Sequence, residues 1–285
     1  MTGARYRAAL ITGATQGIGA ATARLLAPVV EVLFVHGLEP RGAVAGMLDD
    51  LRAASPETGL VYVRADFDRL AELDGLVDAV ARHGAGLDLL VNNAGRPGPA
   101  RRTLSADGHE ATFQTNYLAL VALTSALLTT LASADHARIV NVASRTHLSA
   151  TLELDDLELE RDYNPVAAYA HSKLAIVTYT CWLARRLETS PVEAASLHPG
   201  VISTELLHAM FGTGGAPADV GARNIVELVR RPGSVNGQYF DEDRRSDPNP
   251  QALVIENQER LLAATTRMLE TAGLPVPSAT RGSRR

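Results

Sequence analysis

A glycine-rich segment directly after the first apolar run constrains the fold of this chain more than any other feature. Residues 12–19 read Thr-Gly-Ala-Thr-Gln-Gly-Ile-Gly and lie between an apolar run and a helical pattern. Gly13 permits a tight turn, Gly17 lets the backbone approach a pyrophosphate, and Gly19 lets the helix pack closely on the strand. The helix N-terminus adds free N–H groups and the positive end of a dipole. This order of strand, loop and helix predicts a dinucleotide-binding site.

The rest of the chain alternates short apolar runs with amphipathic helical stretches. Helical patterns cover residues 18–26, 107–131 and 167–187, among others. Seven runs are typical of strands: 7–12, 29–35, 60–65, 87–91, 138–142, 192–198 and 238–240. This alternation predicts an α/β fold, a Rossmann-type doubly wound parallel sheet of about seven strands with helices on both faces. We expect one domain over residues 1–274 and a disordered Pro-, Ser- and Arg-rich tail over 275–285.

Composition excludes several classes of function. With 285 residues, 46% of them hydrophobic, the chain can bury a large core, and its net charge of −5 argues against nucleic acid as a partner. Cys181 is the only cysteine, so no intrachain disulfide forms, and we expect it to be a buried thiol. We find no long uninterrupted apolar run, signal peptide or zinc-type Cys/His spacing. These observations predict a cytoplasmic protein with no membrane partner and no metal.

Tyr169 and Lys173 form the candidate acid/base pair. They are four residues apart in a helical pattern, which places them on one face of a helix. A free tyrosine has a pKa of about 10, so only about one in a thousand is ionised at pH 7. A lysine cation nearby favours the phenolate, and we expect it to lower the pKa of Tyr169. Such pairs are common on amphipathic helices, so the assignment depends on other residues.

Those other residues carry a resemblance to a known family. Asn-Asn-Ala-Gly occupies 92–95 after the fourth strand, and Asn116 lies in the helix that follows. Ser144 follows the fifth strand, and Pro-Gly at 199–200 with Thr204 follows the sixth. With the glycine loop and Tyr-x3-Lys, this order resembles the short-chain dehydrogenase/reductase family across residues 7–240. Segments 141–147, 197–200 and 237–240 are similar to its retinol-dehydrogenase-like branch.

The resemblance implies a hydride-transferring oxidoreductase that acts on a carbonyl or alcohol carbon. Tyr169 is then the acid/base, and Lys173 tunes it and holds the nicotinamide ribose. Ser144 hydrogen-bonds the substrate oxygen, and Asn116 braces a water that links Lys173 to solvent. The expected catalytic set is Asn116, Ser144, Tyr169 and Lys173. The expected cofactor-binding set is Gly13, Thr15, Gln16, Gly17, Ile18, Gly19, His36, Arg41, Asp66, Phe67, Asn92, Ala94, Gly95, Tyr169, Lys173, Pro199, Gly200, Ile202 and Thr204.

The choice between NAD(H) and NADP(H) depends on the segment after the second strand. The family usually carries Asp or Arg where this chain has Leu38, which is a departure from its pattern. His36 and Arg41 can pair with a 2′-phosphate, whereas Glu39 can bind a ribose 2′-hydroxyl. The sequence therefore favours NADP(H) and leaves NAD(H) as the alternative.

Several interpretations stay open. Asp66 either binds the adenine amino group or caps a loop. Thr204 either binds the nicotinamide carboxamide or caps a helix. Asn116 either braces the relay water or is a polar residue that packs within its helix. His147 either faces the substrate or is structural. The acidic segment 151–163 is interpreted as a solvated surface excursion, and 206–217 as an apolar lid.

The substrate is expected to be an apolar small molecule with a carbonyl or secondary alcohol group, a class that includes cyclic and aromatic compounds. Long helices at 107–131 and 167–187 predict a homodimer or homotetramer. The alternative to an enzyme is a catalytically silent NAD(P)-sensing protein on the same fold.

Overall fold

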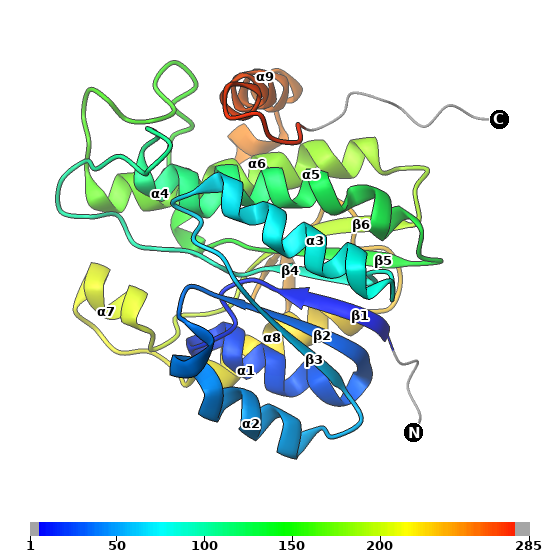
Figure 1. Ribbon diagram of the computed structural model, residues 1–285. Coiled ribbons are helices and arrows are strands. Elements are labelled where there is room, and N and C mark those ends of the chain that lie inside the picture. The colour runs from blue at the N-terminus through cyan, green and yellow to red at the C-terminus, as the bar shows by residue number, and fades with distance from the viewer. Residues whose placement is uncertain (1–5, 277–285) are drawn as a thin grey trace.

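The strands of the computed structural model, which describes residues 6–276, form one sheet (Figure 1). Across the sheet their order is β3 (Gly59–Arg64), β2 (Val30–Gly37), β1 (Tyr6–Ile11), β4 (Leu89–Asn92), β5 (Ala137–Val142), β6 (Val192–His198), β7 (Tyr239–Asp241) and β8 (Arg244–Ser246). The first seven run parallel, and the order reverses direction between β1 and β4. Ligands bind outside the carboxyl ends of such strands at the point of reversal.

The Rossmann-type fold is confirmed, and so are the seven expected strands, with their ends displaced by a few residues. The eighth strand was missed. It pairs antiparallel with β7 in a tight hairpin. Its sequence, Arg-Arg-Ser, is short, polar and without apolar alternation, so no strand pattern marks it.

Helices cover both faces of the sheet (Figure 1). One face carries α1 (Gly17–Leu26), α2 (Ala45–Ala54) and α8 (Ala218–Arg230). The other carries α3 (Leu73–His83), α4 (Ala111–Phe113), α5 (Ala119–Ala132) and α6 (Pro165–Arg186), with α9 (Ile255–Thr271) outside them. The short helix α7 (Glu205–Phe211) stands apart at the carboxyl ends of the strands. Single turns lie at η1 (Ala27–Val29), η2 (Arg41–Val44), η3 (Leu70–Glu72), η4 (Gln114–Leu118), η5 (Arg145–Ser149) and η6 (Pro250–Leu253).

The central strands are apolar on both sides because helices cover both sides. Ala8 and Leu10 face the core under α5 and α6, whereas Ala9 and Ile11 face the core under α1 and α8. All four side chains are fully buried. A parallel strand buried on both faces is therefore continuously apolar rather than alternating.

The expected helix at 107–131 begins at residue 111 and contains a π-turn. Glu110 caps it by accepting hydrogen bonds from the N–H groups of Thr112 (3.0 Å) and Phe113 (2.6 Å). The π-turn η4 follows and leads into α5. Residues Ala111–Ala132 are long and apolar enough to cross a membrane by length and composition, and 61% of that window is buried inside the protein. Such burial is typical of a core helix.

Helix α9 packs on α6, one of the two long helices that were expected to pack between subunits. Leu261, Leu262 and Leu269 of α9 join the same core as α5 and α6. The hydroxyls of Tyr117 and Thr265 lie 2.9 Å apart and share a hydrogen bond. These contacts are intramolecular, and a homodimer or homotetramer stays a prediction.

One expectation changed at the periphery. The acidic segment 151–163 is not simply solvated, because Leu152 and Leu157 are buried in the core and Leu159 is buried as well. Cys181 is a buried free thiol, as expected, and burial raises its pKa to about 11. Of the expected disordered tail, residues 277–285 lie outside the described part of the chain.

Candidate active site

A cavity of about 1350 Å³ lies at the carboxyl ends of the strands, between the glycine loop and α7. It brings together most of the residues expected from the sequence. The expected residues that line it are Gly13, Thr15, Gln16, Gly17, Ile18, Gly19, His36, Asp66, Phe67, Ala94, Gly95, Ser144, Tyr169, Lys173, Pro199, Gly200, Ile202 and Thr204. Arg41, Asn92 and Asn116 are not part of the cavity wall within the described chain.

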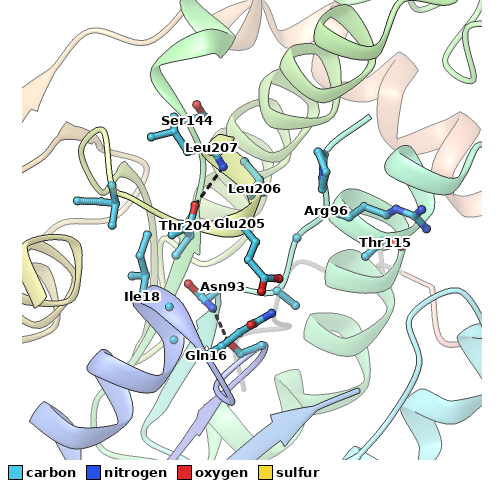
Figure 2. A pocket seen from close by; sticks show the side chains of 18 of the residues that line it. Gln16, Ile18, Asn93, Arg96, Thr115, Ser144, Thr204, Glu205, Leu206 and Leu207 are labelled. Carbon is cyan, nitrogen blue, oxygen red and sulfur yellow. Dashed lines mark hydrogen bonds between the residues drawn. The ribbon is translucent and has the colours of Figure 1, made fainter. Parts of the chain in front are cut away.

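The glycine loop is held in place by the Asn-Asn-Ala-Gly segment. Gly13 has φ +61°, and a Cβ there would lie 2.8 Å from the Ala94 Cα. A Cβ on Gly19 would overlap the Gly13 carbonyl oxygen. Asn93 donates its side-chain amide to the carbonyl oxygens of Thr12 and Gly13, both at 2.9 Å (Figure 2). The loop therefore needs glycine at both positions to keep this geometry.

The first turn of α1 faces the cavity with its backbone N–H groups. Gln16 precedes the helix in an extended conformation and makes no side-chain cap within residues 6–276. Gln16, Gly17, Ile18 and Gly19 all line the cavity. An uncapped helix N-terminus at a cavity wall fits the pyrophosphate of a dinucleotide.

His36 has a different role from the expected one. Its Nδ1 accepts from the Gly13 N–H at 3.1 Å, so Nε2 carries the proton and donates to the Ala65 carbonyl at 3.0 Å. The ring stacks on Phe67 at a centroid distance of 4.4 Å, and burial lowers the pKa of His36 to about 4. A neutral ring with both nitrogens bonded to backbone cannot supply a cation to a 2′-phosphate. His36 instead ties the glycine loop to β2 and β3.

Glu39, rather than Arg41, contributes charge to the adenosine end of the cavity. Arg41 is exposed, whereas Glu39 lines the cavity. The Glu39 carboxylate folds back over Gly37, where a Cβ would lie 2.9 Å from Oε2. That oxygen is buried and has no hydrogen-bond partner among the described residues. Glycine at position 37 leaves the space that the carboxylate occupies.

Asp66 follows β3 and lines the same end. Its Oδ1 accepts from the Asp68 N–H at 3.0 Å, which is the loop-capping role. Asn92 is buried under α5, donating to Thr124 Oγ1 (3.0 Å) and Asn141 Oδ1 (2.8 Å). Asn92 therefore supports the sheet from behind the cavity and does not meet a ligand directly.

The catalytic end is built by α6 and the turn after β5. Asn164 caps α6, accepting from the N–H groups of Val166 (2.9 Å) and Ala167 (3.0 Å). Lys173 Nζ lies 5.5 Å from the centre of the Tyr169 ring and donates to the Val142 carbonyl at 2.9 Å. Ser144 hydrogen-bonds Tyr169 and accepts from the Thr146 N–H at 3.3 Å. Tyr169, Lys173 and Ser144 are thus brought together as expected.

The pKa of Tyr169 differs from the expectation. Burial raises the pKa of Tyr169 to about 12, against a smaller lowering by the hydrogen bond to Ser144. Burial also lowers the pKa of Lys173 to about 8. In the protein alone, loss of solvent outweighs the attraction between phenolate and ammonium. Tyr169 is therefore held as a neutral phenol, the form that donates a proton.

Asn116 lies in the π-turn η4 and acts on the cavity from behind. Its Oδ1 accepts from the Arg96 N–H at 2.8 Å, and its Nδ2 donates to the Arg96 carbonyl (3.1 Å) and Ser172 Oγ (2.9 Å). A Cβ on Gly95 would lie 3.3 Å from Asn116 Oδ1 and 3.4 Å from Lys173 Nζ. Asn116 thus lies beside Lys173, and its part in a water relay stays a prediction.

Helix α7 forms a wall opposite the catalytic residues. Thr204 caps it by accepting from the Leu207 N–H at 3.2 Å, which is the capping role (Figure 2). Leu206, Leu207 and Ala209 line the cavity and give this wall an apolar character.

Sequence reasoning also missed cavity residues. Arg96 lines the wall and forms an ion pair with Asp68, its Nη1 lying 2.9 Å from Oδ1 and 3.1 Å from Oδ2. His198 lines it too, buried, with neither ring nitrogen bonded to any described residue. Arg96 directly follows the Asn-Asn-Ala-Gly segment, so its position in the sequence was the available signal.

Comparisons with known proteins agree with this geometry. The sequence model of the family described as short chain dehydrogenase matches residues 7–213. Human retinol dehydrogenase 13 is 34% identical over 94% of this chain and 85% of its own length. Mouse polyprenol dehydrogenase is 33% identical, also over 94% and 85%.

Solved structures show the same fold. An uncharacterized protein from Mycobacterium paratuberculosis superposes with a TM-score of 0.77 and 27% identity, covering 96% of each chain. The NADPH-bound carbonyl reductase from chicken fatty liver superposes with a TM-score of 0.68 at 24% identity, covering 86% of this chain and 99% of that one.

Proposed function

The chain belongs to the short-chain dehydrogenase/reductase family and is a nicotinamide-dependent oxidoreductase, and we propose that it interconverts an apolar alcohol and its carbonyl compound with Tyr169 as the acid/base. The observation that carries this proposal is the buried hydrogen bond between Tyr169 and Ser144 at the cavity wall, with Lys173 beside it. Two hydroxyls that face one position can hold one substrate oxygen between them.

Each of these side chains has a distinct task. Ser144 offers its hydroxyl to the substrate oxygen as a hydrogen-bond donor, while its own oxygen accepts from the Thr146 N–H. Tyr169 donates its proton as negative charge develops on the carbonyl oxygen, and takes it back in the reverse reaction. Lys173 stabilises the phenolate left behind. The bound nicotinamide supplies or accepts the hydride.

The residues present fit a dinucleotide, and Glu39 favours NAD(H). Glu39 lines the adenosine end, and a carboxylate there is the kind of acceptor that a ribose 2′-hydroxyl needs and that repels a 2′-phosphate. The sequence favoured NADP(H) through His36 and Arg41. His36 is neutral and Arg41 lies outside the cavity wall, so that argument loses its support.

The substrate class follows from the cavity lining. The residues that line it include Leu206, Leu207, Ala209, Pro97 and Pro99. An extended apolar alcohol fits such walls, and two relatives carry the names retinol dehydrogenase and polyprenol dehydrogenase. We therefore propose an isoprenoid or similarly apolar alcohol, which is a narrower class than the apolar small molecules expected from the sequence.

A substrate screen tests the function. Purified protein is mixed with NAD⁺ or NADP⁺ and retinol, a short polyprenol and a panel of cyclic and aliphatic alcohols, and nicotinamide absorbance is followed. We expect turnover with an apolar alcohol, and loss of that turnover in Tyr169→Phe while cofactor binding is kept. Wild-type turnover in Tyr169→Phe would overturn the assignment of Tyr169. Cofactor binding without turnover of any alcohol or carbonyl compound would favour the silent NAD(P)-sensing protein.

A further inference from the structure

The turn that carries Ser144 is fastened by a segment from the far end of the chain. Ser144 precedes η5, and Asn249 precedes η6, about a hundred residues later. Asn249 is 4% exposed, and its side chain points at the backbone of η5. This segment lies beyond residues 7–213, the part of the chain that the family's sequence model matches.

The side-chain amide of Asn249 binds three carbonyl oxygens of this turn. Its Nδ2 lies 3.0 Å from the oxygen of His147, 3.3 Å from that of Leu148 and 2.9 Å from that of Ala150. Its Oδ1 accepts from the Gln251 N–H at 3.0 Å, which fixes which end of the amide faces the turn.

A second set of hydrogen bonds connects Asn249 to Ser144 through the His147 ring. The ring is fully buried, and its Nδ1 donates to the Ser144 carbonyl at 2.6 Å. Its Nε2 accepts from the Asn249 N–H at 3.4 Å. One edge of the ring therefore holds Ser144, and the other edge is held by Asn249. Tyr239 packs against the ring at a centroid distance of 4.6 Å.

We infer that Asn249 is a positioning residue for the reaction: it fixes the Ser144 hydroxyl beside Tyr169 through the η5 backbone and the His147 ring. Neither Asn249 nor His147 lines the cavity within residues 6–276, so both act only through Ser144. Displacing a catalytic group by about 1 Å can cost about a hundredfold in rate. This inference rests on the proposed function, because it assigns Ser144 a part in turnover.

A double-mutant cycle tests it. Asn249→Ser keeps an acceptor for the Gln251 N–H but removes the amide that binds the three carbonyls. With the most active alcohol from the screen above, we expect Asn249→Ser to lower kcat at least tenfold and to leave the cofactor Kd within twofold. In a Ser144→Ala background, we expect the same substitution to lower kcat less than twofold.

The control variant is Asn257→Ala. Asn257 also donates its amide within the C-terminal part, to the Gln251 carbonyl at 3.0 Å, but makes no hydrogen bond to η5 within residues 6–276. It should leave kcat within twofold. Equal loss of kcat in both backgrounds, or no loss in the wild-type background, would overturn the inference. Failure of the proposed function is recognised separately, because Tyr169→Phe would then keep wild-type turnover.

Discussion

The two ends of the cavity differ in whether backbone or side chains form their walls. The adenosine end consists largely of backbone, with Gly13 and Gly19 packed against neighbouring main chain and with Glu39 and Asp66 as charged side chains at its wall. The catalytic end consists of buried side chains, Ser144, Tyr169 and Lys173, whose hydroxyl and ammonium groups are held within a helix and a turn. Changes at the first end should therefore alter which cofactor binds and how tightly. Changes at the second should alter the rate.

The largest expected effect lies at the catalytic end. Ser144→Ala removes the hydroxyl that holds the substrate oxygen, and kcat should fall by about 10²–10³-fold. The cofactor Kd should change less than twofold, as measured by nicotinamide fluorescence. Ser149→Ala is the matched control, because Ser149 lies on the same turn, is exposed, and donates its hydroxyl to the Thr146 carbonyl. A large rise in the cofactor Kd for Ser144→Ala would show that the catalytic end also determines cofactor affinity, and would contradict the division of roles between the two ends.

The next effect lies at the adenosine end. Gly19→Ala puts a Cβ into the Gly13 carbonyl oxygen and near the Asn93 amide, so the loop must shift. Backbone strain of about 1–3 kcal/mol predicts a cofactor Kd raised by roughly tenfold to a hundredfold. At saturating cofactor, kcat should stay within threefold. Gly46→Ala on α2, where a Cβ meets no described atom within 4 Å, should change neither the cofactor Kd nor kcat. A fall in kcat that saturation does not restore would contradict this expectation.

A smaller effect concerns the choice of cofactor. Glu39→Gln removes the charge that favours a ribose 2′-hydroxyl and repels a 2′-phosphate. The ratio of kcat/KM for NADH over NADPH should fall about tenfold, as expected for one hydrogen bond to a charged group. Asp50→Asn, at an exposed position on α2, should leave this ratio unchanged. An unchanged ratio in Glu39→Gln would remove Glu39 from cofactor selection.

The smallest effect is on stability and depends on pH. Burial lowers the pKa of His36 to about 4, from 6.5 in an exposed histidine. Between these values the unfolded chain binds the proton and the folded chain does not. Stability is therefore complete above about pH 6.5 and is lost as the pH falls towards 4. His36→Gln should reduce this slope by up to about 1.4 kcal/mol per pH unit in urea unfolding. His136→Gln, on an exposed side chain, should leave the slope unchanged.

The sequence predicted the parts of the molecule that depend on local pattern. Apolar runs gave seven strands, and the glycine spacing gave the loop geometry. The spacing of Tyr169 and Lys173 placed both on one helix face, as the structure confirms. These features are set within a few residues along the chain, so periodicity and spacing are sufficient to find them.

What the sequence did not predict depends on burial and on contacts between distant segments. From the sequence, His36 was expected to pair with a 2′-phosphate as a cation. In the structure its ring is buried and hydrogen-bonded between Gly13 and Ala65. The pKa of Tyr169 rises because burial outweighs the hydrogen bond to Ser144, and residue spacing gives no information on burial. Glu39 reaches the cavity only because it folds back over Gly37.

The contact between Asn249 and the η5 turn also sets a limit on exchanging parts between relatives. A chimera that joins residues 6–213 of this chain to the C-terminal part of a homologue keeps the glycine loop, Ser144, Tyr169 and Lys173. It also brings a different side chain to the position of Asn249 unless the donor has an asparagine there. Such a hybrid should fold and bind its cofactor yet turn over slowly, and restoring the single asparagine should recover its rate. The part of the chain that must be kept together for full catalysis is therefore longer than residues 7–213, which the family's sequence model matches.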